Sequence, residues 1–144
     1  MIIVSKVSSE EELKQVFTIR NKVFVEEQNC PPELEWEYEY ISIHFLAIYN
    51  GIPAGASRWR KTNEGYKLER FAVLKEFRRK GVGQELVKKT LEDLPKDANK
   101  VYLNAQITVV KLYEKFNFIA IGNIFEEAGI QHYKMILKSN TYKI

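Results

Sequence analysis

A short basic turn with two glycines is the stretch of this sequence whose residue types best suit chemistry. It reads Arg-Arg-Lys-Gly-Val-Gly at residues 78–83, between an apolar segment at 71–74 and an amphipathic segment at 82–94. Glycine lets a backbone approach a ligand closely, and the first turn of a helix leaves N–H groups without intrahelical acceptors at the positive end of the helix dipole. With three cationic side chains alongside, the turn predicts a binding site for an anion such as a phosphate or a pyrophosphate.

The glycines alone do not identify the anion. A dinucleotide fingerprint needs a third glycine, and Leu86 stands in its place. A Walker loop needs Gly-Lys followed by Ser or Thr, a tripeptide that the sequence lacks. A tight turn with a solvated basic rim is the alternative that these residues leave open.

A resemblance to a known family narrows the choice. The pattern Val73-x-x-x-x-Arg78-x-x-Gly81-x-Gly83 resembles the acetyl-CoA-binding signature of the GNAT superfamily of N-acetyltransferases. The resemblance implies that amides of the turn hold the cofactor pyrophosphate and that the main chain of the preceding strand holds the pantetheine arm. Lys75 stands where the family often has proline, and Arg79 where it often has glycine. The cofactor-binding residues predicted in this way are Phe71, Ala72, Val73, Arg78, Arg79, Lys80, Gly81, Val82, Gly83 and Gln84.

Tyr113 has two interpretations. Its spacing from Val109 and Phe116 predicts an aromatic side chain that faces the core. The segment Leu112-Tyr113-Glu114-Lys115-Phe116-Asn117-Phe118 also resembles the second signature of the GNAT family, in which this tyrosine lies beside the cofactor sulfur. That resemblance implies that Tyr113 is a general acid, which donates a proton to the departing CoA thiolate. Asn117 stands where the family has glycine, and asparagine can end a helix in the same way.

Three residues are candidates for the base that neutralises an acceptor amine. Glu69 shares strand parity with Phe71 and Val73, so we expect it to face the cofactor side. Its alternative is a carboxylate paired with a nearby Lys or Arg. His132 can accept a proton near neutral pH, although a histidine in a strand can equally be a hydrogen-bonded structural group. His44 is the third candidate and the weakest.

Polar residues elsewhere are candidates for binding the pantetheine arm or the acceptor. Asn104 and Gln106 come at the end of a buried strand, where an open sheet tends to bind ligands. Residues 28–40 form an irregular segment that we interpret either as a solvated loop or as an acidic wall for a cationic acceptor. Its carboxylates include Glu33, Glu35 and Glu37.

The elements that must position these residues follow from periodicity and turn signals. Ser9 and Glu12 form a capping box for a helix that runs to about Phe24 or Glu26. Asn50-Gly51 predicts a hairpin, and Pro53 predicts a bulge or an edge position in its second strand. Strands are expected at 1–6, 44–49, 52–60, 66–74, 100–105, 118–125 and 131–138, and further helices at 82–94 and 108–116.

This order of elements predicts a mixed α/β (α+β) fold. Because the strand at 100–105 follows a strand and a helix, it should lie parallel beside the strand that contains Phe71. The resemblance implies the GNAT acyl-CoA N-acyltransferase fold, a mostly antiparallel sheet whose one parallel strand pair is splayed around the cofactor. Within that superfamily, the sequence resembles the small bacterial ElaA/YjcF-like group over nearly its whole length. The segments that carry this likeness are residues 19–31, His44, residues 104–106 and residues 127–135.

Composition predicts one well-packed domain over residues 1–144. A chain of 144 residues buries roughly two-thirds of its unfolded surface, and 45% of its residues are apolar. The single cysteine, Cys30, fits a reducing cytosol. The opening apolar run is too short for a signal peptide, and no apolar stretch reaches the roughly 18 residues of a membrane span. The sequence therefore predicts a cytoplasmic protein without a membrane partner.

The function predicted from the resemblance is transfer of acetyl from acetyl-CoA to a primary amine of a small molecule or peptide, by direct attack. A main-chain amide near Val73 would polarise the thioester carbonyl. The two histidines and the cysteine lack ligand spacing, so no metal is expected. A non-catalytic acyl-CoA-binding module is the alternative. A nucleic-acid-binding module ranks third, because the net charge is only +3. A homodimer is one oligomeric state that the sequence leaves open.

Overall fold

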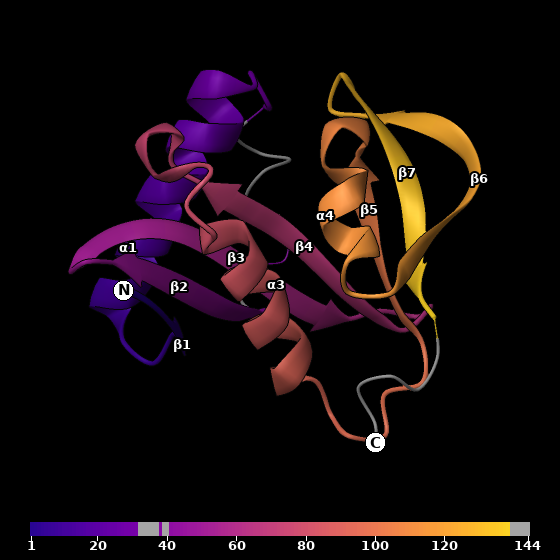
Figure 1. Cartoon of the computed structure of the whole chain (residues 1–144), viewed down its shortest axis with the longest axis horizontal. Helices are drawn as coiled ribbons and strands as arrows, with labels where there is room; N and C mark the ends of the chain where they lie inside the picture. Colours follow the sequence, from indigo (N-terminus) through magenta and orange to yellow (C-terminus); the bar gives the residue numbers. More distant parts are fainter. Residues whose placement is uncertain (32–37, 39–40, 139–144) are drawn as a thin grey trace.

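The computed structural model describes residues 1–31, 38 and 41–138, and the elements are labelled in Figure 1. The strands are β1 (Ile2–Lys6), β2 (Ile43–Tyr49), β3 (Ile52–Lys61), β4 (Tyr66–Val73), β5 (Val101–Gln106), β6 (Phe118–Glu127) and β7 (Ile130–Leu137). The helices are α1 (Glu10–Arg20), the π-helix η1 (Asn21–Glu27), α3 (Val82–Asp93) and α4 (Val110–Glu114), with 3₁₀ turns η3 (Lys75–Phe77) and η4 (Ile107–Val109). The interpretation of residues 28–40 falls largely outside the described residues.

In the described part of the chain, the strands form one sheet in the order β1-β2-β3-β4-β5-β7-β6. Neighbouring strands are antiparallel except β4 and β5, which confirms the predicted parallel pair. These two strands pair only where Tyr66–Leu68 meets Val101–Leu103. Beyond that point they diverge, as Figure 1 shows. The divergence leaves one edge of late β4 without a strand neighbour among the described residues.

The β2–β3 hairpin forms where the sequence predicts it. Asn50 and Gly51 have φ angles of 46° and 86°, the left-handed pair that a tight two-residue hairpin turn requires. The register shifts between Ala47 and Ile48, opposite the residue that follows Pro53. The bulge predicted from Pro53 is therefore confirmed.

Helices cover the two faces of the sheet, with α3 on one face and α1 on the other (Figure 1). The hydroxyl of Ser9 accepts the Glu12 N–H at 3.2 Å, so the predicted Ser9 cap starts α1, whereas the Glu12 carboxylate accepts the N–H of Ser8 rather than that of Ser9. On β2, Phe45 packs in a cluster with residues of α3, whereas its neighbour Leu46 packs in a cluster with residues of α1. This alternation assigns each strand residue to a face. No helix in the described ranges is long and apolar enough to cross a membrane.

A bulge interrupts the alternation in β4. The register of β3 and β4 shifts between Ala56 and Arg58, so that Ser57 lies opposite both Arg70 and Phe71. Arg70 has a φ of 57°, in the left-handed region. One extra residue on a bulged strand reverses the faces of the residues beyond it.

The faces of the β4 side chains follow from this bulge. Leu68, Phe71 and Val73 pack in clusters that contain residues of α3. Ala72 packs with residues of α1. Glu69 alternates with Leu68 and therefore also lies on the α1 face. The expectation that Glu69 shares a face with Phe71 and Val73 is wrong, because the bulge lies between them.

Candidate active site

A cavity of about 470 Å³ lies where β4 and β5 diverge. Its lining comes from both faces of the sheet, so it runs through the gap between the two strands. Lining residues on the α3 side include Phe71, Val73, Gly81, Val82, Gly83 and Tyr113. Lining residues on the α1 side include Val23, Phe24, Gln28, Lys67, Glu69, Asn104, Gln106, Glu127 and His132.

The basic turn ends in a cradle of backbone N–H groups. Gly81, with a φ of 89°, caps α3, and the first N–H bonded back to it is that of Glu85, at 3.2 Å. The N–H groups of residues 82–84 therefore have no acceptor within the helix. Arg79 is also left-handed, with a φ of 65°. An arginine thus adopts the conformation expected of the family's glycine, at a cost of roughly 1–2 kcal/mol. Left-handed residues at Arg79 and Gly81, just before the helix, can turn successive backbone N–H groups toward one point, where they can bind an anion.

The side chains of the turn divide into two groups. Arg79 lines the cavity. Lys80 and Gln84, both predicted to bind the cofactor, do not line it, and the Lys80 ammonium lies 5.7 Å from the centre of the Tyr49 ring. Ala72 also stays outside the lining, because its side chain is buried against α1.

Arg78 joins three parts of the site rather than leaving its guanidinium for a ligand. Its Nη1 and Nη2 donate to the two carboxylate oxygens of Glu27, at 2.7 and 2.8 Å, and its Nε donates to the Val73 carbonyl at 2.9 Å. The hydrogen bonds with Glu27 raise the pKa of Arg78 and lower that of Glu27. The turn is therefore held to the end of β4 and to the end of η1.

Val73 presents its N–H toward the gap. The next residue, Leu74, donates its N–H to the Ala54 carbonyl at 2.9 Å, on the β3 side. Main-chain groups alternate along a strand, so the N–H and C=O of Val73 point away from β3, toward β5. The bond from Arg78 to the Val73 carbonyl agrees with this direction.

Tyr113 both packs in the core and lines the cavity. The residue is 6% exposed, and its ring lies 5.6 Å from that of Phe71 and 6.2 Å from that of Phe118, edge to face. It also lines the cavity, where its hydroxyl makes no hydrogen bond to any of the described residues. Burial raises the pKa of Tyr113 well above its usual value, so the phenol keeps its proton.

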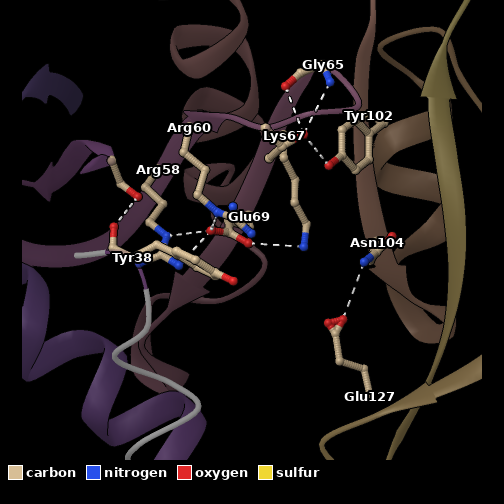
Figure 2. Close-up of polar contacts among 11 residues, drawn as sticks. Tyr38, Arg58, Arg60, Gly65, Lys67, Glu69, Tyr102, Asn104 and Glu127 are labelled. Carbon is tan, nitrogen blue, oxygen red and sulfur yellow. Dashed lines mark hydrogen bonds and ion pairs between the residues drawn. The ribbon is translucent and has the colours of Figure 1, made fainter. Parts of the chain in front are cut away.

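Glu69 lies in a cluster of ion pairs, which Figure 2 shows. Arg58 and Arg60 donate from Nε at 2.8 and 2.7 Å, and the Lys67 ammonium lies 3.3 Å from the second oxygen. Burial alone would raise the pKa of Glu69, but the charge of Arg58, the hydrogen bond from Arg60 and the charge of Lys67 outweigh it and lower the pKa to about 2. These contacts favour the ion-paired alternative over the base.

His132 lines the cavity with a defined tautomer. Its Nδ1 lies 2.7 Å from the Ile130 carbonyl oxygen, which can only accept, so Nδ1 carries the hydrogen and Nε2 of the neutral ring is an acceptor. The ring stacks on Phe125, with centroids 5.7 Å apart. His44 lies instead on β2, next to Phe17 of α1, and does not line the cavity. The structure thus brings one of the two histidines to the site.

Polar side chains on the strands beyond the gap complete the lining. Asn104 Nδ2 donates to Glu127 at 3.4 Å, and Gln106 Nε2 donates to Gln28 at 3.0 Å. Sequence reasoning gave no site role to Glu127, Gln28 or Lys67. The signals for Glu127 were its place between the strands expected at 118–125 and 131–138 and its position in residues 127–135, which carry the likeness to the ElaA/YjcF-like group. Among the residues that the structure describes, no group of three or more potential ligands could hold a metal ion.

The family of the chain is shown by comparison with known proteins. The model of the acetyltransferase (GNAT) domain matches residues 5–139. The chain therefore belongs to the GNAT acetyltransferase family, whose members transfer acyl groups from acyl-CoA, and the predicted GNAT fold is confirmed.

Individual relatives place the chain within that family. A Bacillus subtilis (strain 168) protein described as the uncharacterized N-acetyltransferase YjcF is 42% identical over 133 residues, 89% of this chain and 94% of that protein. Escherichia coli (strain K12) ElaA is 31% identical over 137 residues, 86% of each chain. The crystal structure of Escherichia coli ElaA has a TM-score of 0.81 at 30% identity, covering 96% of this chain and 100% of that one. The resemblance to the ElaA/YjcF-like group is confirmed.

One solved structure of lower sequence identity contains a bound acyl-CoA. The crystal structure of a GNAT family acetyltransferase from Elizabethkingia anophelis has acetyl-CoA bound. It is 18% identical to this chain, with a TM-score of 0.68, and covers 94% of each chain. At that identity the likeness concerns the fold.

Proposed function

We propose that this protein is an N-acetyltransferase that transfers acetyl from acetyl-CoA to a primary amine by direct attack. The observation that carries the proposal is that an N–H cradle, a buried protonated phenol and a histidine acceptor nitrogen line one cavity. We further propose that residues 1–144 act as one domain, in the cytoplasm, on a small-molecule or peptide amine.

The residues present fit the donor. The N–H groups of residues 82–84 and the left-handed Arg79 and Gly81 suit a pyrophosphate. The open edge of β4 at Phe71 and Val73 offers main-chain groups to a pantetheine arm. When bound, acetyl-CoA supplies an acetyl group activated as a thioester.

Each step then has a group in this chain. His132 Nε2 accepts a proton from the acceptor ammonium and so produces the nucleophilic amine. The Val73 N–H hydrogen-bonds the carbonyl oxygen on which negative charge develops. As the C–N bond forms and the C–S bond breaks, Tyr113 gives its hydroxyl proton to sulfur and recovers one from nitrogen. One proton is released per acetyl group transferred.

Calorimetric titration of acetyl-CoA tests the cradle with a matched pair of variants. Gly81 and Gly122 are both left-handed, at φ of 89° and 73°, and no neighbour lies within 3.5 Å of a Cβ at either position. Gly122 lies on β6 and does not line the cavity. We expect Gly81→Asp to abolish binding, because its carboxylate would repel the pyrophosphate, and Gly122→Asp to bind as the wild type does. If the folded wild type does not bind acetyl-CoA, the proposed acetyltransferase activity is wrong.

A further inference from the structure

Four polar side chains of the cavity lie on one face of the sheet. Gln106 of β5 is the register partner of His132 of β7, which in turn is the partner of Phe125 of β6. Asn104 precedes Gln106 by two residues, and Glu127 follows Phe125 by two, so both share the face of His132. This face is the α1 side. It is also the side of the Glu69 cluster on the opposite wall of the cavity.

The two walls carry opposite charges. On the β4 wall, Lys67 shares the single carboxylate of Glu69 with Arg58 and Arg60 of β3, which lie outside the cavity lining. The Lys67 ammonium has three N–H groups, and among the described residues its one ion pair is the 3.3 Å contact with Glu69. On the other wall, the side chain of Glu127 accepts one hydrogen bond from a described residue, the neutral amide of Asn104 at 3.4 Å. Figure 2 shows Lys67 extending from β4 toward the side on which Asn104 and Glu127 lie.

Two carboxylates line the cavity among the described residues, Glu69 and Glu127. Three cations surround Glu69, so a further ammonium gains little there. Glu127 faces a neutral amide and is therefore the carboxylate that can receive an ammonium. His132, whose Nε2 is an acceptor, lies on the same face, diagonally across the β6–β7 ladder.

We propose that Glu127 binds the ammonium of the acceptor, that Lys67 binds a carboxylate of the same molecule, and that the acceptor is therefore an amino carboxylic acid. This inference rests on the proposed acetyl transfer to an amine and names the acceptor class for the same site. A diamine fits less well, because its second ammonium would meet the Lys67 ammonium, which lies in a cluster where three cations surround the one carboxylate of Glu69. A plain alkylamine would offer the Lys67 ammonium no carboxylate.

Steady-state kinetics at saturating acetyl-CoA, with release of the CoA thiol as the readout, test the acceptor class. The acceptors are ω-amino carboxylic acids, alkylamines of the same length and α,ω-diamines, with free α-amino acids as a fourth set. We expect at least a tenfold higher kcat/KM for one of the two amino carboxylic acid sets than for the matched alkylamines, and the lowest values for the diamines. Equal values for acids and alkylamines, or a preference for diamines, would overturn the proposal.

Two variants test whether Glu127 binds the ammonium of the acceptor and Lys67 its carboxylate. We expect Glu127→Gln to raise the KM of every amine at least tenfold with a smaller change in kcat. We expect Lys67→Gln to raise the KM of the amino acids about tenfold and to leave that of the alkylamines unchanged. Glu126→Gln, the neighbour on the opposite face of β6, and Lys88→Gln, exposed on α3, are the matched controls and should behave as the wild type. An unchanged KM in Glu127→Gln would also overturn the proposal.

Calorimetry separates this inference from the proposed function. Each variant is first titrated with acetyl-CoA, and unchanged binding shows that it is folded. The wild type is then titrated with the preferred amino carboxylic acid in the presence of CoA. Binding that depends on Glu127 but leads to no transfer would support this inference and overturn the acetyltransferase. Transfer to alkylamines that is insensitive to the Glu127 substitution would support the acetyltransferase and overturn this inference.

Discussion

Glu69 and Phe71 lie two residues apart on β4, yet their side chains face opposite sides of the sheet. Arg70, inserted between them as a bulge with a φ of 57°, causes the reversal. Phe71 consequently lies against Tyr113 on the α3 side, where the donor is expected. Glu69 lies on the α1 side, among Arg58, Arg60 and Lys67. The bulge therefore separates the cofactor contacts of β4 from its ion-pair cluster.

The ion pairs of Glu69 lead to a prediction about stability. Its pKa is about 2 in the folded protein, against 4.5 for the free side chain. A lowered folded pKa stabilises the protein above about pH 4.5, and this contribution is lost as the pH falls toward 2. The difference corresponds to roughly 3 kcal/mol. We expect Glu69→Gln to lower the free energy of unfolding by about that amount at pH 7, because it leaves buried cations without their carboxylate.

Urea unfolding at a series of pH values measures this contribution. The wild type should lose stability steeply between about pH 5 and 2, and Glu69→Gln should lose less over the same window. Glu92→Gln is the control, because Glu92 pairs with Lys89 on the surface, where a change of at most about 0.5 kcal/mol is expected. Parallel pH curves for the wild type and Glu69→Gln would contradict the assignment. The pH–rate profile of the folded Glu69→Gln should keep the wild-type shape.

The contact between Arg78 and Glu27 leads to a prediction about the affinity of the basic turn for acetyl-CoA. Lysine at position 78 cannot make both the two-fold contact with Glu27 and the bond to the Val73 carbonyl. We therefore expect Arg78→Lys to raise the Kd of acetyl-CoA roughly tenfold, about 1.4 kcal/mol.

Glu27→Gln decides between positioning and direct binding. If Arg78 positions the turn, this variant also weakens acetyl-CoA binding, although Glu27 itself meets no phosphate. If the Arg78 guanidinium binds the phosphate directly, removing its competitor Glu27 tightens binding instead. Glu26→Gln, one residue earlier on η1, is the control and should leave the Kd unchanged. Tighter binding in Glu27→Gln would thus exclude the positioning role.

The features that could be predicted from the sequence have short-range causes. The Asn50-Gly51 turn, the Ser9 cap and the start of α3 after Gly81 each depend on the preferences of adjacent residues. The parallel pairing of β4 and β5 follows from the handedness of a strand–helix–strand unit. These rules operate within one element or one connection, and the structure confirms them.

The features that escaped prediction depend on distant partners. Arg70 and Arg79 adopt left-handed conformations that arginine rarely takes, so nothing in their residue type indicates the bulge at Arg70 or the left-handed turn at Arg79. Glu27 meets Arg78 across 51 positions, and Asn104 meets Glu127 across 23. Such contacts exist only once the sheet has formed. The face of Glu69, and with it the choice of base, could not be read from strand parity.

His132 can be tested with an isosteric change. Asparagine at position 132 can still donate an N–H to the Ile130 carbonyl, but it lacks the acceptor at the position of Nε2. We expect His132→Asn to fold normally and to lose at least tenfold in kcat/KM at pH 7. If His132 removes the proton of the acceptor ammonium, the loss should shrink as the pH approaches the pKa of the free amine. A loss that stays constant with pH would contradict a role as base.

Tyr113 makes the prediction that separates an enzyme from an acyl-CoA-binding module. Its hydroxyl bonds to no described residue, so Tyr113→Phe should change neither the stability nor the Kd of acetyl-CoA appreciably. Loss of a general acid should lower kcat by about 10²- to 10⁴-fold. Tyr133→Phe, on β7 and outside the cavity lining, is the control. Burial raises the pKa of Tyr113, so the proton donor persists to higher pH than an ordinary tyrosine, whose pKa is about 10. The wild-type kcat should therefore not fall between about pH 8 and 10 through ionisation of this residue. A Tyr113→Phe variant that transfers acetyl at the wild-type rate would remove the phenol from the mechanism.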